Sequence, residues 1–184
     1  MPIIGFLLFY GGYIKMKVNN IRLRQEVFTN DAWKIIDWLE DEEVVEYLNE
    51  GQNVCKSIKQ VIHNTNMPIL THLFNNDGSF FMVTTKKDEP IGFLRLVPKP
   101  NGAEMVIVIG DREKWGQGLG PEAIFEGLKH AFFNWRVDEV IAKISCENKR
   151  STKAFKKIGF TKDKEFSKQI QYTLSMEEFL KIAA

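Results

Sequence analysis

DREKWGQGLGPEAIF, residues 111–125, contains three glycines within five residues, followed directly by a proline and an apolar helical pattern. The segment EMVIVIG before it predicts a buried strand, and Ile124 and Leu128 begin the apolar stripe of an amphipathic helix. Glycines let the backbone approach an anion closely, and the first amides of a helix favour negative charge. Pro121 suits the first helical turn because it needs no amide partner there. The stretch therefore predicts a strand, an anion-binding loop and a helix; the alternative is an ordinary glycine-rich turn.

The order of residues in this loop excludes two common phosphate-binding loops. A dinucleotide fingerprint reads GxGxxG, whereas Gly116, Gly118 and Gly120 form GxGxG and are followed by Pro121. A Walker loop ends in Gly-Lys-Ser/Thr, and no such triplet follows Gly120. We therefore expect neither a dinucleotide-binding fold nor a P-loop nucleotidase.

The periodicity of the remaining sequence predicts a mixed sheet with helices on its faces. Alternating or buried apolar runs predict strands at 19–28, 79–87, 90–98, 102–110, 139–146 and 169–175. Helical spacing predicts two short helices within 29–51, broken near Asp41, and further helices at 55–66, 121–135 and 148–159. The fold class is α/β (α+β).

The composition of the chain limits the classes of function that it can have. The 184 residues, of which 44% are hydrophobic, suit one domain. Lys+Arg number 25 and Asp+Glu 24, so no overall field favours nucleic acid or an anionic membrane. Cys55 and Cys146 are too few for a disulfide framework, and no Cys/His cluster predicts a metal site. We expect a cytoplasmic protein without a metal, a nucleic-acid partner or a membrane partner.

The first twenty residues, MPIIGFLLFYGGYIKMKVNN, differ from the rest in composition. The apolar run lacks a preceding basic residue and a cleavage site, which makes it a weak signal peptide, and it is too short to span a bilayer. We expect residues 1–15 to be a leader and residues 16–184, beginning at Met16, to form a single domain. The alternative is that the leader adds an edge strand or a dimer contact.

Two motifs resemble those of a known family. WGQGLGPEA resembles motif A of the GNAT superfamily of acetyl-CoA-dependent N-acetyltransferases, which reads Arg/Gln-x-x-Gly-x-Gly/Ala. Gly118 and Gly120 fill the glycine positions, and Trp115 stands where the family has Arg or Gln.

The second motif lies farther along the chain, in ENKRSTKAFKKIGF. It is similar to the family's Asn-x-x-Ser-x-x-x-Tyr-x-x-x-Gly-Phe and matches at Asn148, Ser151, Gly159 and Phe160, with Phe155 in place of the tyrosine. Asn148 is also a natural helix N-cap. Within the superfamily the chain most resembles the ribosomal-protein N-acetyltransferases, the Rim-type branch.

The resemblance implies a GNAT fold, with a mixed, mostly antiparallel twisted sheet and helices on both faces. It also implies that acetyl-CoA is the cosubstrate and that its pantetheine arm enters between two splayed strands. A cluster of basic residues around Lys156 would meet the nucleotide end. The implied acetyl-CoA contacts are Val108, Ile109, Trp115, Gly116, Gln117, Gly118, Leu119, Gly120, Asn148, Ser151, Phe155 and Lys156.

The catalytic groups are less well specified. Many family members use a tyrosine as general acid, and Phe155 removes it from its usual place. A thiolate is a fair leaving group without help, and water, Ser151 or Tyr172 are the candidates to replace the acid. Glu104 is the candidate base, acting through water or by attracting the amine; the alternative is a solvated strand-end carboxylate. We expect direct transfer in a ternary complex.

The acceptor is the least determined partner. An acidic stretch on the early helices would suit a cationic amine such as a polyamine, an aminoglycoside or a basic protein N-terminus, and the alternative is a solvated helix face. The acidic residues are Glu40, Asp41, Glu42, Glu43, Glu46 and Glu50. Two function classes follow: an N-acetyltransferase acting on a primary amine, or a CoA-binding module with little turnover. A homodimer is expected from the family.

Overall fold

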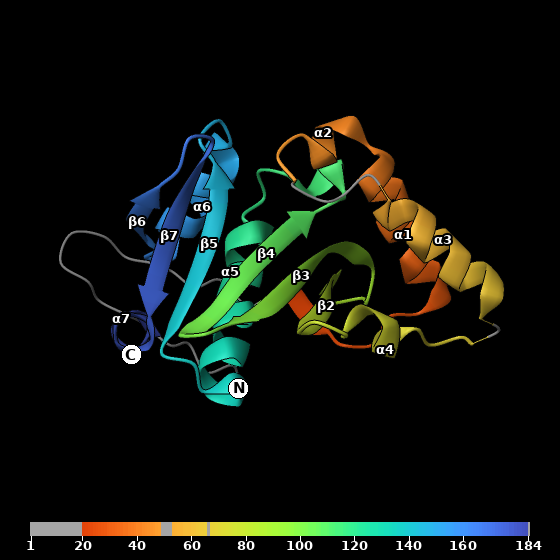
Figure 1. Ribbon diagram of the computed structural model, residues 1–184, viewed down its shortest axis with the longest axis horizontal. Helices are drawn as coiled ribbons and strands as arrows, with labels where there is room; N and C mark the ends of the chain where they lie inside the picture. Colours follow the sequence, from red (N-terminus) through yellow and green to blue (C-terminus); the bar gives the residue numbers. More distant parts are fainter. Residues whose placement is uncertain (1–19, 49–52, 66, 184) are drawn as a thin grey trace.

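The structure, a computed structural model, describes residues 20–48, 53–65 and 67–183. The predicted leader, residues 1–15, lies outside the described residues. A twisted sheet runs through the described chain, and its seven strands have the order β1-β2-β3-β4-β5-β7-β6 (Figure 1). Their bounds are β1 Ile21–Arg24, β2 Ser79–Thr85, β3 Pro90–Lys99, β4 Gly102–Ile109, β5 Glu139–Ser145, β6 Thr161–Glu165 and β7 Gln169–Ser175.

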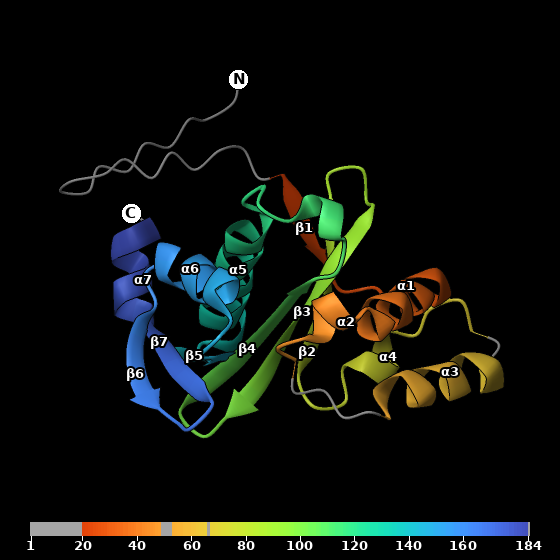
Figure 2. The ribbon, with the colours of Figure 1, turned by 90° about the horizontal axis from the view of Figure 1, so that it is seen from above.

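The helices cover both faces of this sheet (Figure 2). One face carries α1 Thr29–Glu40, α2 Glu42–Val45, α3 Val54–Asn64 and α4 Thr71–Phe74; the other carries α5 Leu119–Lys129, α6 Lys149–Lys157 and α7 Met176–Ala183. A 3-10 turn, η1 Arg112–Lys114, precedes α5, and a π-helical segment, η2 His130–Trp135, continues it. The predicted α/β class and mixed sheet are confirmed.

One strand pair has a different geometry from the rest. Neighbouring strands are antiparallel except β4 and β5, which are parallel. Their pairing is limited to Ala103 with Val140 and Glu104 with Ile141. Beyond Glu104 the two strands diverge, as Figure 1 shows, so that edge of β4 faces no strand partner.

The helix after the glycine loop anchors the larger part of the core. Its predicted stripe is present: Ile124, Leu128 and Phe132 are fully buried against the sheet. Gly127 lets this helix approach closely, because an added Cβ would lie 2.7 Å from Leu94 Cδ1. This packing holds the start of α5 beside the divergence of β4 and β5.

Several boundaries agree with the sequence predictions and some elements were missed. The break near Asp41 is confirmed, since its carboxylate accepts from the Glu43 amide at 2.9 Å and caps α2. The strand Thr161–Glu165 was not predicted, because all five of its residues are exposed and it lacks apolar alternation. The C-terminal helix α7 was also missed. Cys146, expected in a buried strand, is exposed just after β5.

Candidate active site

A cavity of about 690 Å³ opens where β4 and β5 diverge. Both strands line it, together with the glycine loop and the first turns of α5 and α6; α2 and the residues just after it contribute Val44, Tyr47 and Leu48. The volume is typical of a site for a sizeable ligand. One end faces the start of α5, and the other end reaches Glu104, where the strands rejoin.

The glycine loop is shaped by two left-handed residues. Gly116 has φ 77° and Gly118 has φ 82°, a conformation that favours glycine. Gly118 is the N-cap of α5, so the amides of the first helical turn have no intrahelical acceptor. The Trp115 amide is not available to an anion, because it donates to the Arg112 carbonyl at 3.1 Å.

Nothing in the fold itself requires a glycine at position 120. Its φ is not in the left-handed region, and an added Cβ would meet only Ile109 Cγ1, at 4.0 Å. Both residues line the cavity. The missing side chain therefore leaves open space directly over the helix N-terminus, where an anion would lie.

Trp115 contributes its side chain as well as its backbone. Its indole nitrogen donates to the Ile109 carbonyl at 2.7 Å, and the Arg150 guanidinium lies 3.5 Å above the ring. Burial lowers the pKa of Arg150, and the nearby Glu46, Tyr47 and Glu43 oppose that effect. The stack connects α6 to the glycine loop across the cavity entrance.

The acidic stretch is partly neutralised by the protein itself. Arg112 pairs with Glu43 at 2.5 Å and approaches Asp41 at 3.5 Å, and Lys59 pairs with Glu40 at 2.5 Å. The Arg112 pairs connect α2 to the turn before the glycine loop, and the Lys59 pair connects α3 to α1. Three of the predicted acceptor-attracting carboxylates thus already have cationic partners, while Glu50 lies outside the described residues.

The start of α6 has the predicted cap. Asn148 Oδ1 accepts from the Ser151 amide at 2.9 Å, and both residues line the cavity. Phe155 also lines it, with its buried ring edge-on to Phe160 at 4.9 Å between centroids. Asn148 therefore caps the helix with its oxygen and leaves its side-chain amide hydrogens for a ligand.

Two substitutions separate these roles of Asn148. Asn148→Asp keeps a good cap and removes the donor, so we expect unchanged stability and about 10-fold weaker acetyl-CoA binding. Asn148→Ala should lose the same affinity and also about 1 kcal/mol of stability. Calorimetric titration and urea unfolding of both variants would check this. Native affinity in Asn148→Asp would leave the residue with a capping role alone.

Glu104 lies at the closed end of the cavity between two lysines. Its Oε2 is 3.0 Å from Lys99 Nζ and 3.2 Å from Lys143 Nζ. Burial acts to raise the pKa of this carboxyl, but the hydrogen bonds and charges of both lysines outweigh it and hold the pKa below its ordinary value. Glu104 is therefore a weaker base than an ordinary glutamate, and the alternative of a solvated carboxylate does not describe it.

This lowered pKa predicts a pH dependence of stability. Above the ordinary glutamate pKa the carboxylate is ionised in both folded and unfolded chains, and its ion pairs stabilise the fold fully. That contribution is lost as the pH falls through the lowered pKa of the folded state. Glu104→Gln should cost up to about 1 kcal/mol at neutral pH, and this cost should shrink as the pH falls below the ordinary glutamate pKa, measured by urea unfolding. A difference independent of pH would contradict the ion-pair account.

Comparison with known proteins assigns this architecture to a family. Residues 21–161 match the model of the Acetyltransferase (GNAT) domain. The chain belongs to this family. The predicted GNAT fold, N-acetyltransferase class and acetyl-CoA cosubstrate are confirmed at the level of the family, whereas the Rim-type branch stays a prediction.

Individual relatives of this GNAT domain are distant. The N-acetyltransferase 9-like protein of Nematostella vectensis is 31% identical over 84 residues, 45% of this chain and 42% of that protein. The uncharacterized N-acetyltransferase p20 of Bacillus licheniformis is 25% identical over 140 residues, 72% of this chain and 75% of that protein. The chain thus spans under half the length of the first relative.

Solved structures with the same fold carry CoA. Spermidine N-acetyltransferase from Vibrio cholerae, in complex with CoA and spermine, superposes with TM-score 0.72 at 17% identity, covering 88% of this chain and 98% of that one. Aminoglycoside acetyltransferase AAC(6')-Ib in complex with coenzyme A gives TM-score 0.73 at 14% identity, covering 89% and 99%. At these identities the likeness establishes the fold.

Three predicted residues of the GNAT site lie outside the cavity lining. Tyr172 is buried on the α6 side of the sheet, with Lys156 Nζ 5.7 Å from its ring centroid. Gln117 is exposed and donates to the Glu113 carbonyl at 2.8 Å. Tyr172 does not line this cavity, and its role as the acid stays a prediction. Its alternation with the buried Leu174 had already indicated a core-facing position.

The remaining predicted residues are brought together as expected. The cavity is lined by Glu104, Val108, Ile109, Trp115, Gly116, Gly118, Leu119, Gly120, Asn148, Ser151 and Phe155. The sequence did not indicate Lys143, because only the pairing of β4 with β5 brings it to Glu104. No group of metal-binding side chains occurs among the described residues, and none of the described helices is long and apolar enough to cross a bilayer.

Proposed function

We propose that the chain transfers the acetyl group of acetyl-CoA to a primary amine by direct attack in a ternary complex. The divergence of β4 and β5 above a glycine loop at a helix N-terminus carries this proposal. The loop amides and the α5 N-terminus would bind the pyrophosphate, and the free edge of β4 near Val108 and Ile109 would pair with the amide groups of the pantetheine arm.

The proposed reaction requires one bond exchange. The neutral amine nitrogen attacks the thioester carbonyl carbon, the carbon–sulfur bond breaks, and the proton lost by nitrogen leaves CoA as a thiol. A backbone amide on the edge of β4 would stabilise the oxyanion. Glu104, which is ionised before the attack, would take up the amine proton through water and release it as CoA leaves. Ser151 is the side-chain candidate in the cavity lining to supply a proton to sulfur.

The test is release of CoA thiol from acetyl-CoA with a panel of amines and an amine-free blank. Spermidine and an aminoglycoside represent the acceptors of the structural relatives, and peptides with free N-termini represent protein acceptors. Release above the blank for one class would establish the enzyme and its acceptor. If acetyl-CoA stabilised the fold and no amine raised the rate, the CoA-binding module would replace the enzyme.

Phe155→Tyr separates the two function classes further. The ring of Phe155 lines the cavity, so an added hydroxyl would supply the general acid that the family usually has. We expect kcat to rise about 10-fold with an unchanged KM for acetyl-CoA. Phe160→Tyr, outside the cavity lining, is the matched control. Unchanged kcat in a folded Phe155→Tyr would show that protonation of sulfur does not limit the rate.

The cytoplasmic location, the homodimer and the Rim-type branch remain proposals of the same kind. A protein N-terminus would be the acceptor if that branch is correct, and the peptide arm of the panel tests it directly.

A further inference from the structure

A second cavity, of about 320 Å³, lies between the sheet and the helices α1, α3 and α4. Most of its lining is aliphatic or aromatic, and the polar and charged members are Ser57, Asn76, Asp77, Ser79 and Arg95. The apolar lining includes Val54, Ile58, Val61, Phe74, Phe80 and Phe93. Nothing in the proposed reaction uses this cavity so far.

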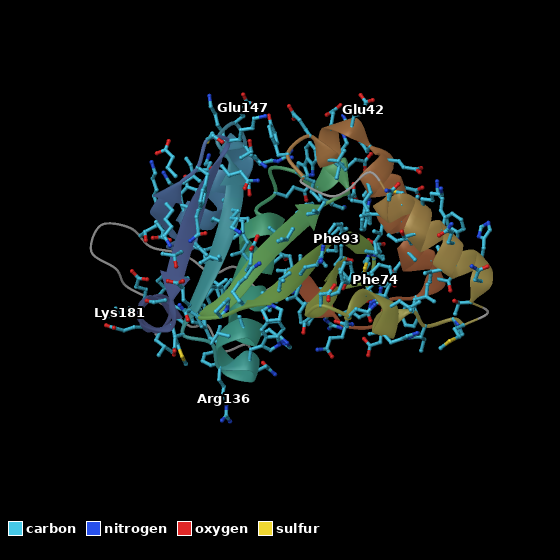
Figure 3. The ribbon with its side chains drawn as sticks, in the orientation of Figure 1. Glu42, Phe74, Phe93, Arg136, Glu147 and Lys181 are labelled. Carbon is cyan, nitrogen blue, oxygen red and sulfur yellow. The ribbon has the colours of Figure 1, made fainter. Side chains whose placement is uncertain are left out.

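The floor of the second cavity is a row of aromatic rings. Phe80 lies 4.9 Å from Phe74 and 5.4 Å from Phe93, measured between ring centroids. Figure 3 labels Phe93 on β3 and Phe74 on α4. Because Phe80 and Phe93 are almost completely buried, this floor is held rigidly by the core beneath it.

The roof of the cavity is the helix α3, which contacts α1 through Trp33 and His63 but is only partly buried. The apolar residues Val54, Ile58 and Val61 recur at helical spacing along α3 and all line the cavity. An amphipathic helix normally buries such a stripe, yet none of the described residues of α3 is buried. Protein interiors rarely leave a void of this size unfilled. The apolar face of α3 therefore covers a hollow that a ligand could complete.

The second cavity adjoins the candidate active site across a single strand pair. In the β3–β4 register Val97 lies opposite Glu104, and Arg95 lies opposite Val106. The β3 members of these pairs line the second cavity, and the β4 members line the first. Paired residues point to the same face, and neighbouring strands lie about 4.8 Å apart. One small molecule can therefore place an amine beside Glu104 and another group in the second cavity.

We propose that the second cavity binds the apolar part of the acceptor, so that the preferred substrate is a primary amine bearing a compact branched-aliphatic or aromatic group. This inference rests on the proposed function. The volume is at the small end for ligand sites and suits a compact group such as a phenyl ring or a branched alkyl chain. A second ammonium, as in a polyamine, would lose hydration against the aromatic floor, and Asp77 is the one carboxylate among the lining residues.

The test compares acetylation of four primary amines: 2-phenylethylamine, 3-methylbutylamine, ethylamine and 1,4-diaminobutane. We expect kcat/KM about 10- to 100-fold higher for the first two, since burial of such a group contributes a factor of that size. Ser57→Trp should fill the cavity, because Ser57 lines it from an exposed position on α3. In that variant the preference should disappear, with ethylamine turnover and the KM for acetyl-CoA unchanged.

Gln60→Trp is the matched control, because Gln60 is exposed on the same helix and does not line the cavity. It should keep the preference. Turnover of ethylamine without a preference for the apolar amines, or a preference that survives Ser57→Trp, would overturn the inference and leave the proposed function intact.

If no amine is acetylated, the proposed function fails. The inference about the second cavity is then tested separately, by measuring whether an apolar amine binds. Calorimetric titration of 2-phenylethylamine into the protein saturated with CoA should show binding by the native chain and by Gln60→Trp, and none by Ser57→Trp. No binding to the native chain would overturn the inference. Binding that appears only after removal of residues 1–15 would also overturn it, since the leader would then be the occupant.

Discussion

Gly120→Val is expected to weaken acetyl-CoA binding about 100-fold while changing the free energy of unfolding by less than about 1 kcal/mol. The added side chain would stand over the N-terminus of α5 in space that the protein itself leaves open. Losing two charge-assisted hydrogen bonds, donated by loop amides to the pyrophosphate, accounts for an effect of this size. Calorimetric titration with acetyl-CoA and urea unfolding measure the two quantities.

Gly127→Ala, on the same helix, is the matched control. Its Cβ would lie 2.7 Å from Leu94 Cδ1 and 2.9 Å from Met105 Cε, so overpacking should cost about 1 to 3 kcal/mol of stability. Affinity for acetyl-CoA should be retained, because Gly127 does not line the cavity. Native affinity in Gly120→Val would show that the phosphates bind elsewhere than at this loop.

Asp31→Ala is expected to lower the free energy of unfolding by about 3 kcal/mol. Asp31 is buried, and its Oδ2 accepts from Arg24 Nη2 at 2.8 Å and from the Phe28 amide at 2.8 Å. Among the described residues, its removal would leave Asp88 at 3.3 Å as the carboxylate partner of the Arg24 charge, which is largely shielded from solvent. It would also remove the acceptor that satisfies an amide at the start of α1.

The urea midpoint should fall with an unchanged denaturant dependence, because the folded and unfolded surfaces stay the same. Asp37→Ala, at an exposed position of α1, should change stability by less than about 0.5 kcal/mol. A loss below about 1 kcal/mol in Asp31→Ala would mean that water or Asp88 replaces the pairing.

The sequence predicted most of the elements because their signals are local. Helical spacing located α3 and α5, and Asp41 marked the break between α1 and α2. The strand β6 escaped prediction because its residues are all exposed and mostly charged, so it is defined only by pairing with β7.

The site could be predicted in part. The acetyl-CoA contacts at the glycine loop and the start of α6 lie within two short motifs, so their residues could be named. The environment of Glu104 could not be predicted. Lys143 lies 39 residues away and meets it only through strand pairing. The carboxylate of Glu104 is a weaker base because of contacts that the sequence around Glu104 does not indicate.

The sequence by itself determined the anion-binding loop, the amphipathic helices and the capping of α6, because glycine conformation, helix dipoles and side-chain caps act within a few residues. Only the tertiary structure decided that β4 and β5 part beyond Glu104, that Glu104 is held by two lysines, and that α3 covers a hollow. Each of these depends on how segments far apart in the chain pack together. The cavity beneath α3 is a place where such packing is missing, so no local sequence pattern predicts it.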